Sequence, residues 1–280
     1  MNRLAALALL ACAALLAACA QPPRPTPTPE DTLRIVTLNI YHDRAEWARR
    51  EPLVVAGLRQ LQPDVITLQE VLQHEQLPNQ AQTIADALGY RVHFVSIDPE
   101  SAARRYGNAI LTRHHLLHAG AQRLQPLEDS RTVAHARIDT GSATVDVYAT
   151  HLHWTHAGGS IRERQVRDLV EYIAATRGDA PVIVAGDFNA PADAPEFALL
   201  REGFVDAYGA AHPSAGDGTG EAYTTLNPAF FERRSRIDHV FVERGRVDVV
   251  DAARILDAAG ADGTWPSDHF GISATLRLRR

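Results

Sequence analysis

Short apolar runs alternate with amphipathic segments along most of the chain, and this pattern predicts a mixed α/β domain. Residues 181–185 (Pro-Val-Ile-Val-Ala) are an uninterrupted apolar run, which is typical of a buried strand. Residues 47–61 and 160–175 instead carry apolar residues at helical spacing, so we expect amphipathic helices there. Another helix is expected at 81–88, because Gly89 is a usual helix stop. The other expected strands are residues 33–40, 64–70, 90–97, 106–112, 132–139, 143–151, 237–242, 246–255 and 270–278.

The alternation continues from residue 32 to residue 280 without a second linker, which favours one domain over this range. Hairpin-like strands mixed with covering helices indicate two packed sheets with helices outside them, an α/β sandwich. Residues 209–221 are rich in Gly, Ala and Ser, and we expect a surface loop there.

Residues 1–18 have the pattern of a signal peptide. Arg3 supplies a positive start, and the apolar stretch that follows is shorter than the roughly 20 residues that span a bilayer. Leu-Ala-Ala-Cys at 16–19 is typical of a bacterial lipoprotein, in which Cys19 becomes the lipidated first residue; an ordinary secretory peptide is the alternative. The Pro/Thr-rich residues 19–31 would then be a tether. We therefore expect an exported protein, anchored by lipid to a membrane of the bacterial cell envelope.

Composition limits the chemistry of the domain. Cys12 and Cys19 are the two cysteines of the chain and both precede the domain, which excludes disulfides, thiolate metal sites and cysteine nucleophiles within it. The net charge of −6 argues against a broad basic surface for nucleic acid, but a metal ion and a few local arginines can supply a positive field. The candidates for that local field are Arg104, Arg105, Arg233, Arg234 and Arg236.

Polar residues follow several of the expected strands at the point where each strand ends. Asp187 and Asn189 come directly after the apolar run 181–185, and an Asp-x-Asn pair places two oxygen side chains on one face. Asn39, Glu70 and His151 follow other strands in the same way. Two further stretches, Arg-Ile-Asp-His at 236–239 and Ser-Asp-His at 267–269, add carboxylates and imidazoles. These residues predict a site built where several strands end.

With these motifs in order between residues 33 and 278, the chain resembles the endonuclease/exonuclease/phosphatase superfamily, the deoxyribonuclease I-like group, as a bacterial lipoprotein member. The resemblance implies a four-layer α-β-β-α sandwich of two mixed, largely antiparallel sheets covered by helices. It also implies metal-dependent hydrolysis of a phosphate ester. The fold agrees with the sandwich that the strand and helix pattern indicates.

Glu70 is the best candidate for direct metal coordination. A carboxylate after a buried strand is costly unless it meets a cation or strong donors, and hard oxygen ligands suit Mg²⁺, with Mn²⁺ as the alternative. A surface or helix-capping glutamate is the other interpretation. Asn39 and Asp268 are expected in or next to the same coordination sphere, directly or through water.

The remaining site residues are assigned to the chemistry of phosphoryl transfer. Asp187 and Asn189 would hold and activate the attacking water, while His151 and His269 would contact the phosphoryl oxygens. Asp238 is expected to orient His269 and raise its pKa. Asp187 is favoured as the general base, and the Asp238–His269 pair is the alternative.

Asn108 and His239 are assigned from the strands on which they lie. Asn108 lies in a stretch that resembles the family's central strand, and we expect it to face the site. His239 alternates to the other face from Asp238, so its default role is in the core or in support of the site residues. His151, His153 and His156 also permit a zinc site, but no matching carboxylate spacing accompanies them. His114, His115 and His118 are expected to be loop or surface residues.

The expected activity is that of a phosphodiesterase acting on nucleic acid or a lipid headgroup. Alternatives are a phosphomonoesterase acting on inositol or sugar phosphates, and a catalytically silent module that binds phosphorylated ligands. The expected partners are a phosphate ester, which is nucleic acid, phospholipid or a small molecule, and the membrane through its lipid anchor. We expect a monomer. Substrate choice in such folds lies in loops, so the sequence predicts the reaction class and leaves the substrate open.

Overall fold

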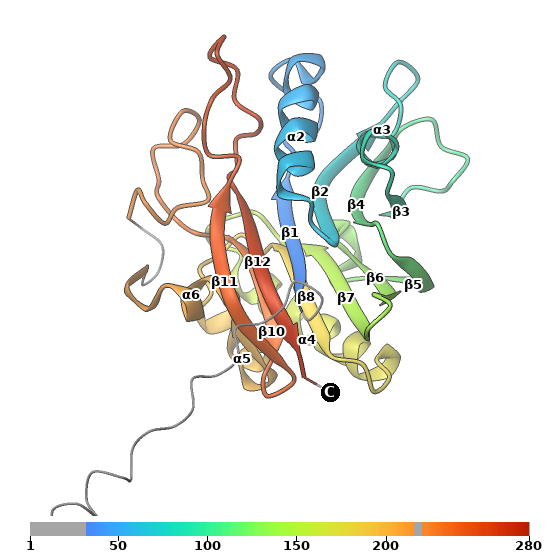
Figure 1. The fold of residues 1–280 in the computed structure, drawn as a ribbon, viewed down its shortest axis with the longest axis vertical. Coiled ribbons are helices and arrows are strands. Elements are labelled where there is room, and N and C mark those ends of the chain that lie inside the picture. The colour runs from blue at the N-terminus through green and yellow to red at the C-terminus, as the bar shows by residue number, and fades with distance from the viewer. Residues whose placement is uncertain (1–31, 216–219, 280) are drawn as a thin grey trace, which may run out of the picture. The chain divides into compact units, whose positions relative to one another are not determined.

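Two six-stranded sheets form the centre of the protein (Figure 1). The computed structural model describes residues 32–215 and 220–279, so the predicted signal peptide, Cys19 and the tether lie outside the described residues. None of the helices in those two ranges is long and apolar enough to cross a membrane.

The first sheet has the strand order β11-β12-β1-β2-β4-β3, and the second has the order β5-β6-β7-β8-β10-β9. In the first sheet the strands are β1 (Leu33–Asn39), β2 (Val65–Gln73), β3 (Arg91–Ser96), β4 (Arg105–Thr112), β11 (Val247–Ile255) and β12 (Gly271–Leu278). In the second they are β5 (His115–Arg123), β6 (Thr132–Asp139), β7 (Thr144–His151), β8 (Val182–Asp187), β9 (Phe204–Asp206) and β10 (Asp238–Glu243). The pairs β1–β2 and β7–β8 are parallel and the other pairs are antiparallel, so both sheets are mixed and largely antiparallel.

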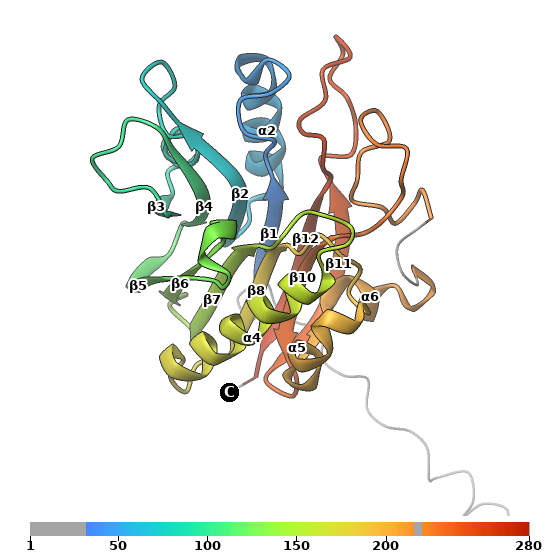
Figure 2. The ribbon, with the colours of Figure 1, turned by 180° about the vertical axis from the view of Figure 1, so that it is seen from behind.

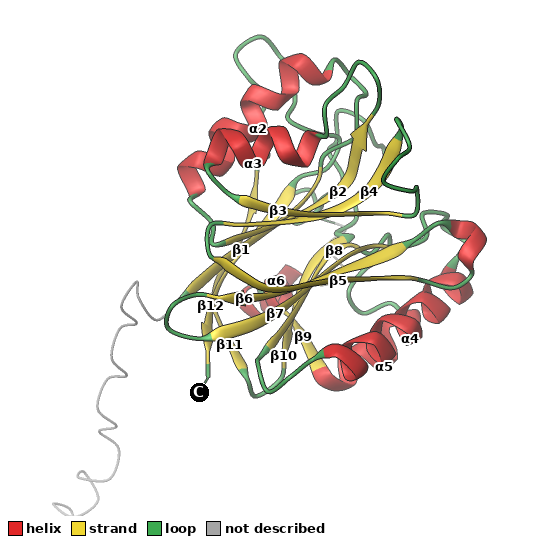
Figure 3. Ribbon diagram, turned by 90° about the vertical axis from the view of Figure 1, so that its right-hand side faces the viewer, coloured by secondary structure: helices red, strands yellow, loops and turns green. Residues whose placement is uncertain are grey.

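Helices cover the outer faces of both sheets, which confirms the predicted four-layer sandwich (Figure 3). The helices α2 (Trp47–Leu61) and α3 (Gln80–Leu88) lie on the first sheet. The helices α4 (Gly159–Thr176) and α5 (Ala198–Gly203) lie on the second (Figure 2). The short helix α6 (Ala207–Ala211) contacts β10 and β11.

Strand alternation divides the core into three apolar layers. On β1, Val36 and Leu38 pack under α2 while Ile35 faces the other sheet. On β8, Val184 packs under α4 while Ile183 faces the first sheet. The same alternation carries the last residue of each strand, Asn39 in β1 and Asp187 in β8, into the space between the sheets.

One local prediction was partly wrong. Residues 209–221 were expected to be a surface loop, but α6 extends to Ala211 and Ala215 is buried in the core between the sheets, whereas Pro213, Ser214, Gly220 and Glu221 are exposed. Asp206 caps α6 by accepting from the backbone N–H of Gly209 at 3.0 Å, and this cap starts the short helix. His115 and His118 are exposed, as expected of surface residues, although they lie in β5, a largely exposed strand that the sequence pattern did not predict.

Candidate active site

The predicted carboxylates and imidazoles of the second sheet meet at the ends of β7, β8 and β10. Asp187 is paired in register with His151 of β7 and with Asp238 of β10. His151 Nε2 lies 3.5 Å from Asp187 Oδ2, and His269 Nδ1 is hydrogen-bonded to Asp238 Oδ2 at 2.9 Å. His269 Nδ1 is also 3.9 Å from Asp187 Oδ2, so His269 lies between two carboxylates.

The first sheet contributes to the same place through β1. Asn39 donates from Nδ2 to Asp187 Oδ2 at 3.0 Å, and its Oδ1 accepts from the backbone N–H of Tyr41 at 3.0 Å. Ser267 donates to the backbone carbonyl of Asn39 at 2.6 Å, which fixes the Ser-Asp-His turn against the end of β1. Polar contacts therefore join the end of β1 both to β8 and to the Ser-Asp-His turn at the site.

Glu70 reaches the site through a β-bulge. Along β2, Ile66 and Leu68 pack under the helices, and plain alternation would send Glu70 to that same side. The register with β4 instead shifts between Leu68 and Val71, and Glu70 adopts a left-handed φ of 59°. This irregularity turns the Glu70 carboxylate into the cavity, where its side chain is 19% exposed.

Gly186 allows β8 to lie close to β7 next to the site. Its φ is 153°, and a Cβ at this position would lie 1.9 Å from the backbone carbonyl oxygen of Thr150. Such a contact is far inside van der Waals distance, so glycine is the residue that this position accepts. The close approach sets the pairing of Asp187 with His151.

A cavity of about 510 Å³ opens over these side chains. It is lined by Glu70, Tyr106, Arg131, His151, Trp154, His156, Asp187, Asn189, Leu226, Phe231, Arg233, Ile237, Asp268 and His269. Six of the nine predicted catalytic and metal-binding residues are in this lining: Glu70, His151, Asp187, Asn189, Asp268 and His269. Asn39 and Asp238 lie directly behind it through their bonds to Asp187 and His269.

Asn108 has a different position. It is buried, and its amide donates to the backbone carbonyl and the hydroxyl of Thr132 at 3.1 and 3.2 Å. It thus joins β4 to β6 across the two sheets and does not line the cavity. Asn189 lines the cavity, but its amide also donates to the carbonyl of Leu152 at 3.0 Å and so fixes the loop after β7.

Burial close to other carboxylates raises the pKa of two acids of the site, Asp187 and Asp268. Burial and the nearby Asp238 raise the pKa of Asp187 to about 7. Burial raises the pKa of Asp268 to about 6, and the carboxylate of Glu70 contributes to the increase. Burial alone would lower the pKa of His269, but the charge and hydrogen bond of Asp238 hold that pKa well above its usual value.

The two imidazoles of the site differ in charge. Burial and the nearby Arg131 and His269 hold the pKa of His151 well below its usual value, so His151 is neutral where His269 is a cation. Arg131, at the start of β6, lines the cavity and lies 3.7 Å from Asp129. The site therefore combines a cation, a neutral imidazole and carboxylates of raised pKa within one cavity.

The candidate arginines divide between the cavity and other positions. Arg233 lines the cavity, whereas Arg236 is buried on the far side of β10 in an ion pair of 2.8 Å with Asp206. Arg236 also donates to His239. The ring of His239 lies beside Phe188 and Phe241 in the core under α4, as its default core role predicts.

The histidines of the segment after β7 are separated. His153 bonds Asp129 at 2.8 Å, whereas His156 lines the cavity.

Trp154, Phe231 and Tyr106 also line the cavity, and sequence reasoning did not find them. Trp154 and Phe231 lie in loops and Tyr106 lies near the start of β4, and the sequence around them carries no motif that marks them. Phe231 packs edge-on against the ring of His269, with ring centroids 5.9 Å apart.

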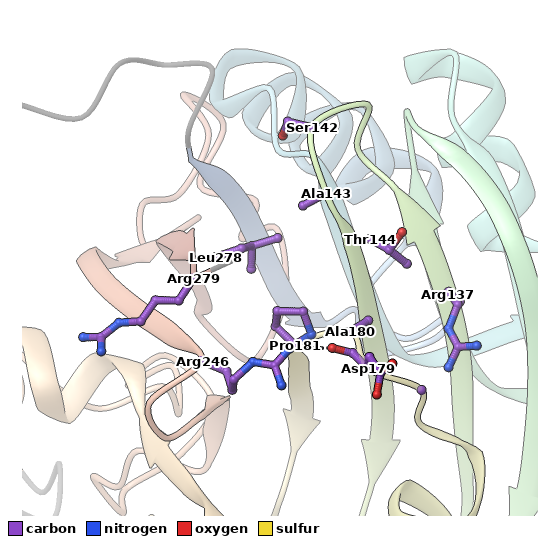
Figure 4. A pocket seen from close by; sticks show the side chains of 11 residues that line it. Arg137, Ser142, Ala143, Thr144, Asp179, Ala180, Pro181, Arg246, Leu278 and Arg279 are labelled. Atoms are coloured by element: carbon purple, nitrogen blue, oxygen red, sulfur yellow. Dashed lines mark hydrogen bonds between the residues drawn. The ribbon is translucent and has the colours of Figure 1, made fainter.

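A second cavity, of about 450 Å³, lies at the opposite end of β7 and β8, near residues 142–144 and 178–181 (Figure 4). Three arginines line it, and each is already engaged by the protein. Arg137 pairs with Asp146, Arg279 pairs with Asp248, and Arg246 donates to a backbone carbonyl. Because these partners neutralise or occupy the guanidinium groups, the first cavity is the better candidate for an active site.

Comparison with known proteins identifies the family. A family model described as the Endonuclease/Exonuclease/phosphatase family matches residues 36–269. The chain belongs to this family. Nocturnin of Drosophila melanogaster is 28% identical over 83% of the chain and 42% of Nocturnin, so the chain spans less than half of that relative. YbhP of Escherichia coli (strain K12) is 25% identical over 91% of the chain and the whole of YbhP.

Solved structures share the fold. The crystal structure of D. rerio TDP2 complexed with single strand DNA product has a TM-score of 0.71 and 22% identity, with 88% of this chain and 99% of that chain covered. The members of the family are phosphoester hydrolases that depend on divalent metals. The chain is therefore a homologue of phosphoester hydrolases. Its site should accordingly offer ligands for a divalent cation.

The donor set fits such a cation. Glu70 and Asp268 line one cavity, where burial and mutual repulsion raise the pKa of Asp268, and a cation would relieve that repulsion. Asp187, Asp238 and His269 also have ligand atoms within 4.8 Å of one another. In that trio, however, His269 Nδ1 is hydrogen-bonded to Asp238, and a metal ion would have to break this bond. The oxygen ligands Glu70 and Asp268, with Asn39 beside them, are the better match to a hard cation.

Proposed function

We propose that this chain is a phosphoester hydrolase that depends on Mg²⁺, with Mn²⁺ as a substitute, and that it cleaves phosphodiesters with an activated water molecule. The observation that carries the proposal is the convergence of Glu70 from β2, Asp187 from β8, and Asp268 and His269 from the turn before β12 on one cavity. Phosphoryl transfer requires positioning and charge stabilisation more than covalent catalysis, and this set provides both.

Asp187 is the general base in this proposal. Asn39 donates to one of its oxygens and the backbone N–H of Asn189 to the other, at 3.0 and 2.9 Å, so the carboxylate is held in a single orientation. Its raised pKa brings proton acceptance close to neutral pH, where general bases are most effective. Asp187 would take the proton from the attacking water.

His269 and His151 act on the phosphoryl group from two sides. His269, held charged by Asp238, would stabilise the negative charge that develops on the equatorial oxygens. His151 remains neutral and would donate or accept a hydrogen bond at the same group. Asp238 acts through His269 and is a positioning residue.

Glu70 and Asp268 would hold the metal ion, with Asn39 at the edge of its shell. When bound, a divalent ion supplies Lewis-acid polarisation of the phosphoryl oxygens and charge neutralisation. Tyr106 lines the same cavity, and burial and the Glu70 carboxylate raise its pKa, so it stays a neutral donor.

A membrane location is part of the proposal. The predicted lipidation of Cys19 and the tether at 19–31 would hold the domain at the cell envelope. The support for this location is the lipoprotein-type sequence at 16–19.

The function is tested with a panel of DNA, RNA, sphingomyelin, phosphoinositides and a chromogenic phosphodiester. Each is assayed with Mg²⁺, with chelator, and with Mg²⁺ restored, using wild type and Asp187→Asn. We expect hydrolysis of a diester that chelator abolishes, that Mg²⁺ restores and that Asp187→Asn lowers by orders of magnitude. Hydrolysis that persists in chelator, or that the variant leaves unchanged, would contradict the assignment. Binding without turnover of any member would favour the silent module, and turnover of monoesters alone would favour a phosphatase.

A further inference from the structure

The mouth of the active-site cavity carries an unusually exposed aromatic ring. Among residues 32–215 and 220–279, the strongly exposed aromatic side chains are Trp154 (68%) and Phe230 (40%). Trp154 lines the cavity itself, and Phe230 is the neighbour of Phe231, which also lines it. Exposed apolar groups gathered at one place on a soluble domain mark binding surfaces.

The indole of Trp154 has no partner within the part of the chain that the structure describes. It makes no hydrogen bond, ring contact or cation–π contact there, whereas Phe230 packs against Tyr41 with centroids 5.8 Å apart. A tryptophan that contributes to the core would be covered, as Trp47 at the start of α2 is. Trp154 instead presents a free flat face at the entrance to the site.

The cavity has charged side chains at its floor and an aromatic ring at its mouth. Asp187 at the floor is 1% exposed and carries the charged chemistry, while Trp154 forms part of the rim. Arg131 and Arg233 line the same cavity and supply positive charge. A substrate that fits has a phosphate at the floor, a planar ring at the rim and further negative charge near the arginines.

These features favour a nucleotide over a lipid. An acyl chain that reached the floor of this cavity would desolvate the charged groups there, among them Glu70, Asp187 and Asp268. A nucleobase instead stacks on an aromatic ring whatever its identity, and such stacking contributes about 1–3 kcal/mol per base. The loop that carries Trp154 begins directly after His151, so the platform is fixed to the catalytic strand.

We propose that Trp154 is a stacking platform for the nucleobase of the substrate, and that the enzyme acts on nucleotide phosphodiesters such as single-stranded nucleic acid. This inference rests on the proposed phosphodiesterase function of the same cavity. The contact with the base specifies the substrate and takes no part in the chemical step.

The test removes the ring and the base separately. Thymidine 5′-(p-nitrophenyl phosphate) and the matching ester of 1,2-dideoxyribose 5-phosphate share the scissile bond and the leaving group, and differ in the base. We expect Trp154→Leu to lower kcat/KM for the thymidine ester by about 5- to 150-fold, the range that one stacked base gives. It should change kcat/KM for the base-free ester by less than about twofold, and Trp154→Phe should keep most of the activity, because the ring is retained.

The control variant is Leu117→Ala, which alters an exposed apolar side chain on β5 outside the cavity lining and should leave both substrates unaffected. The proposal fails if Trp154→Leu and Trp154→Phe behave alike, or if Trp154→Leu lowers activity equally on both esters. It also fails if Trp154→Leu abolishes binding to phosphatidylglycerol vesicles while hydrolysis of the thymidine ester is unchanged. That outcome would make the ring a membrane contact.

A binding measurement separates this inference from the proposed function. Quenching of tryptophan fluorescence by oligothymidylate in metal-free buffer needs no catalysis, and Trp154 is the most exposed of the indoles among the described residues. If no phosphodiester is hydrolysed, the proposed function fails, yet quenching that is present in wild type and lost in Trp154→Phe supports the platform. Equal quenching in both proteins contradicts it.

Discussion

His239 gives a quantitative test of the packing that supports the site. Its Nε2 bonds the carbonyl of Ala190 at 2.9 Å and its Nδ1 accepts from Arg236 at 2.8 Å, so the imidazole connects β10 to the loop after Asp187. Burial, reinforced by the Arg236 guanidinium, lowers the pKa of His239 from 6.5 to about 4. The folded protein therefore keeps this imidazole neutral while the unfolded chain protonates it.

The sign and size of the effect follow from this difference. Because the pKa is lower in the folded state, stability is complete above about pH 6.5 and is lost as the pH falls towards 4. Between about pH 7.5 and about pH 4.5, His239 alone should remove about 2.5 kcal/mol from the free energy of unfolding. Other groups, including Asp187, change stability over the same range, so the difference between two proteins is the useful quantity.

The perturbation is His239→Gln, whose amide can still donate to Ala190 but does not titrate. We expect the free energy of unfolding of the variant, measured by urea denaturation, to fall less than that of wild type by about 2.5 kcal/mol between the two pH values. His115→Gln, at an exposed position on β5, should give a curve parallel to wild type. Parallel curves for His239→Gln as well would refute the assignment of His239 as a neutral buried imidazole.

Four further substitutions test other parts of the structure. Gly186→Ala should lower the free energy of unfolding by about 3 kcal/mol or more, seen as a lower thermal midpoint, because its Cβ would collide with the backbone of β7; an unchanged midpoint would show that β7 and β8 do not approach this closely. Asp238→Asn should move the alkaline limb of the pH–rate profile to lower pH, because His269 loses the charge that raises its pKa, with little change in apparent Mg²⁺ affinity. Asp268→Asn should instead weaken the Mg²⁺ dependence more than it moves either limb; identical behaviour of the two variants would mean one coupled network. Cys19→Ser should shift the protein from the membrane to the soluble or unprocessed fraction, and equal solubility of both forms would reject the lipoprotein interpretation.

Strand periodicity predicted much of the fold and part of the site. The alternation that buries Val36 and Leu38 also sends Asn39 between the sheets, so its meeting with Asp187 follows from the pattern. The four-layer sandwich followed from the same pattern and from the order of the motifs. These features are local or repeat along each strand, and a sequence records them directly.

Other features depend on irregular backbone and could not be derived in this way. Plain alternation places Glu70 on the wrong face, and the bulge with its left-handed φ corrects this without a glycine to mark it. Trp154 and Phe231 belong to loops whose course is set by tertiary contacts. The edge strand β5 and the helix α6 lack the apolar periodicity that identifies elements, because β5 is exposed and α6 is made of small residues.

The most direct test of the central claim is a Mg²⁺ titration of phosphodiester hydrolysis in wild type, Glu70→Gln and Glu75→Gln. Glu75 is an exposed glutamate shortly after the same strand, so it controls for the charge change. We predict that Glu70→Gln loses most of its activity at every Mg²⁺ concentration and keeps its thermal midpoint, while Glu75→Gln matches wild type. Wild-type turnover in Glu70→Gln would contradict the assignment of Glu70 as a metal ligand. The bulge would then place a carboxylate in the cavity without a role in metal binding.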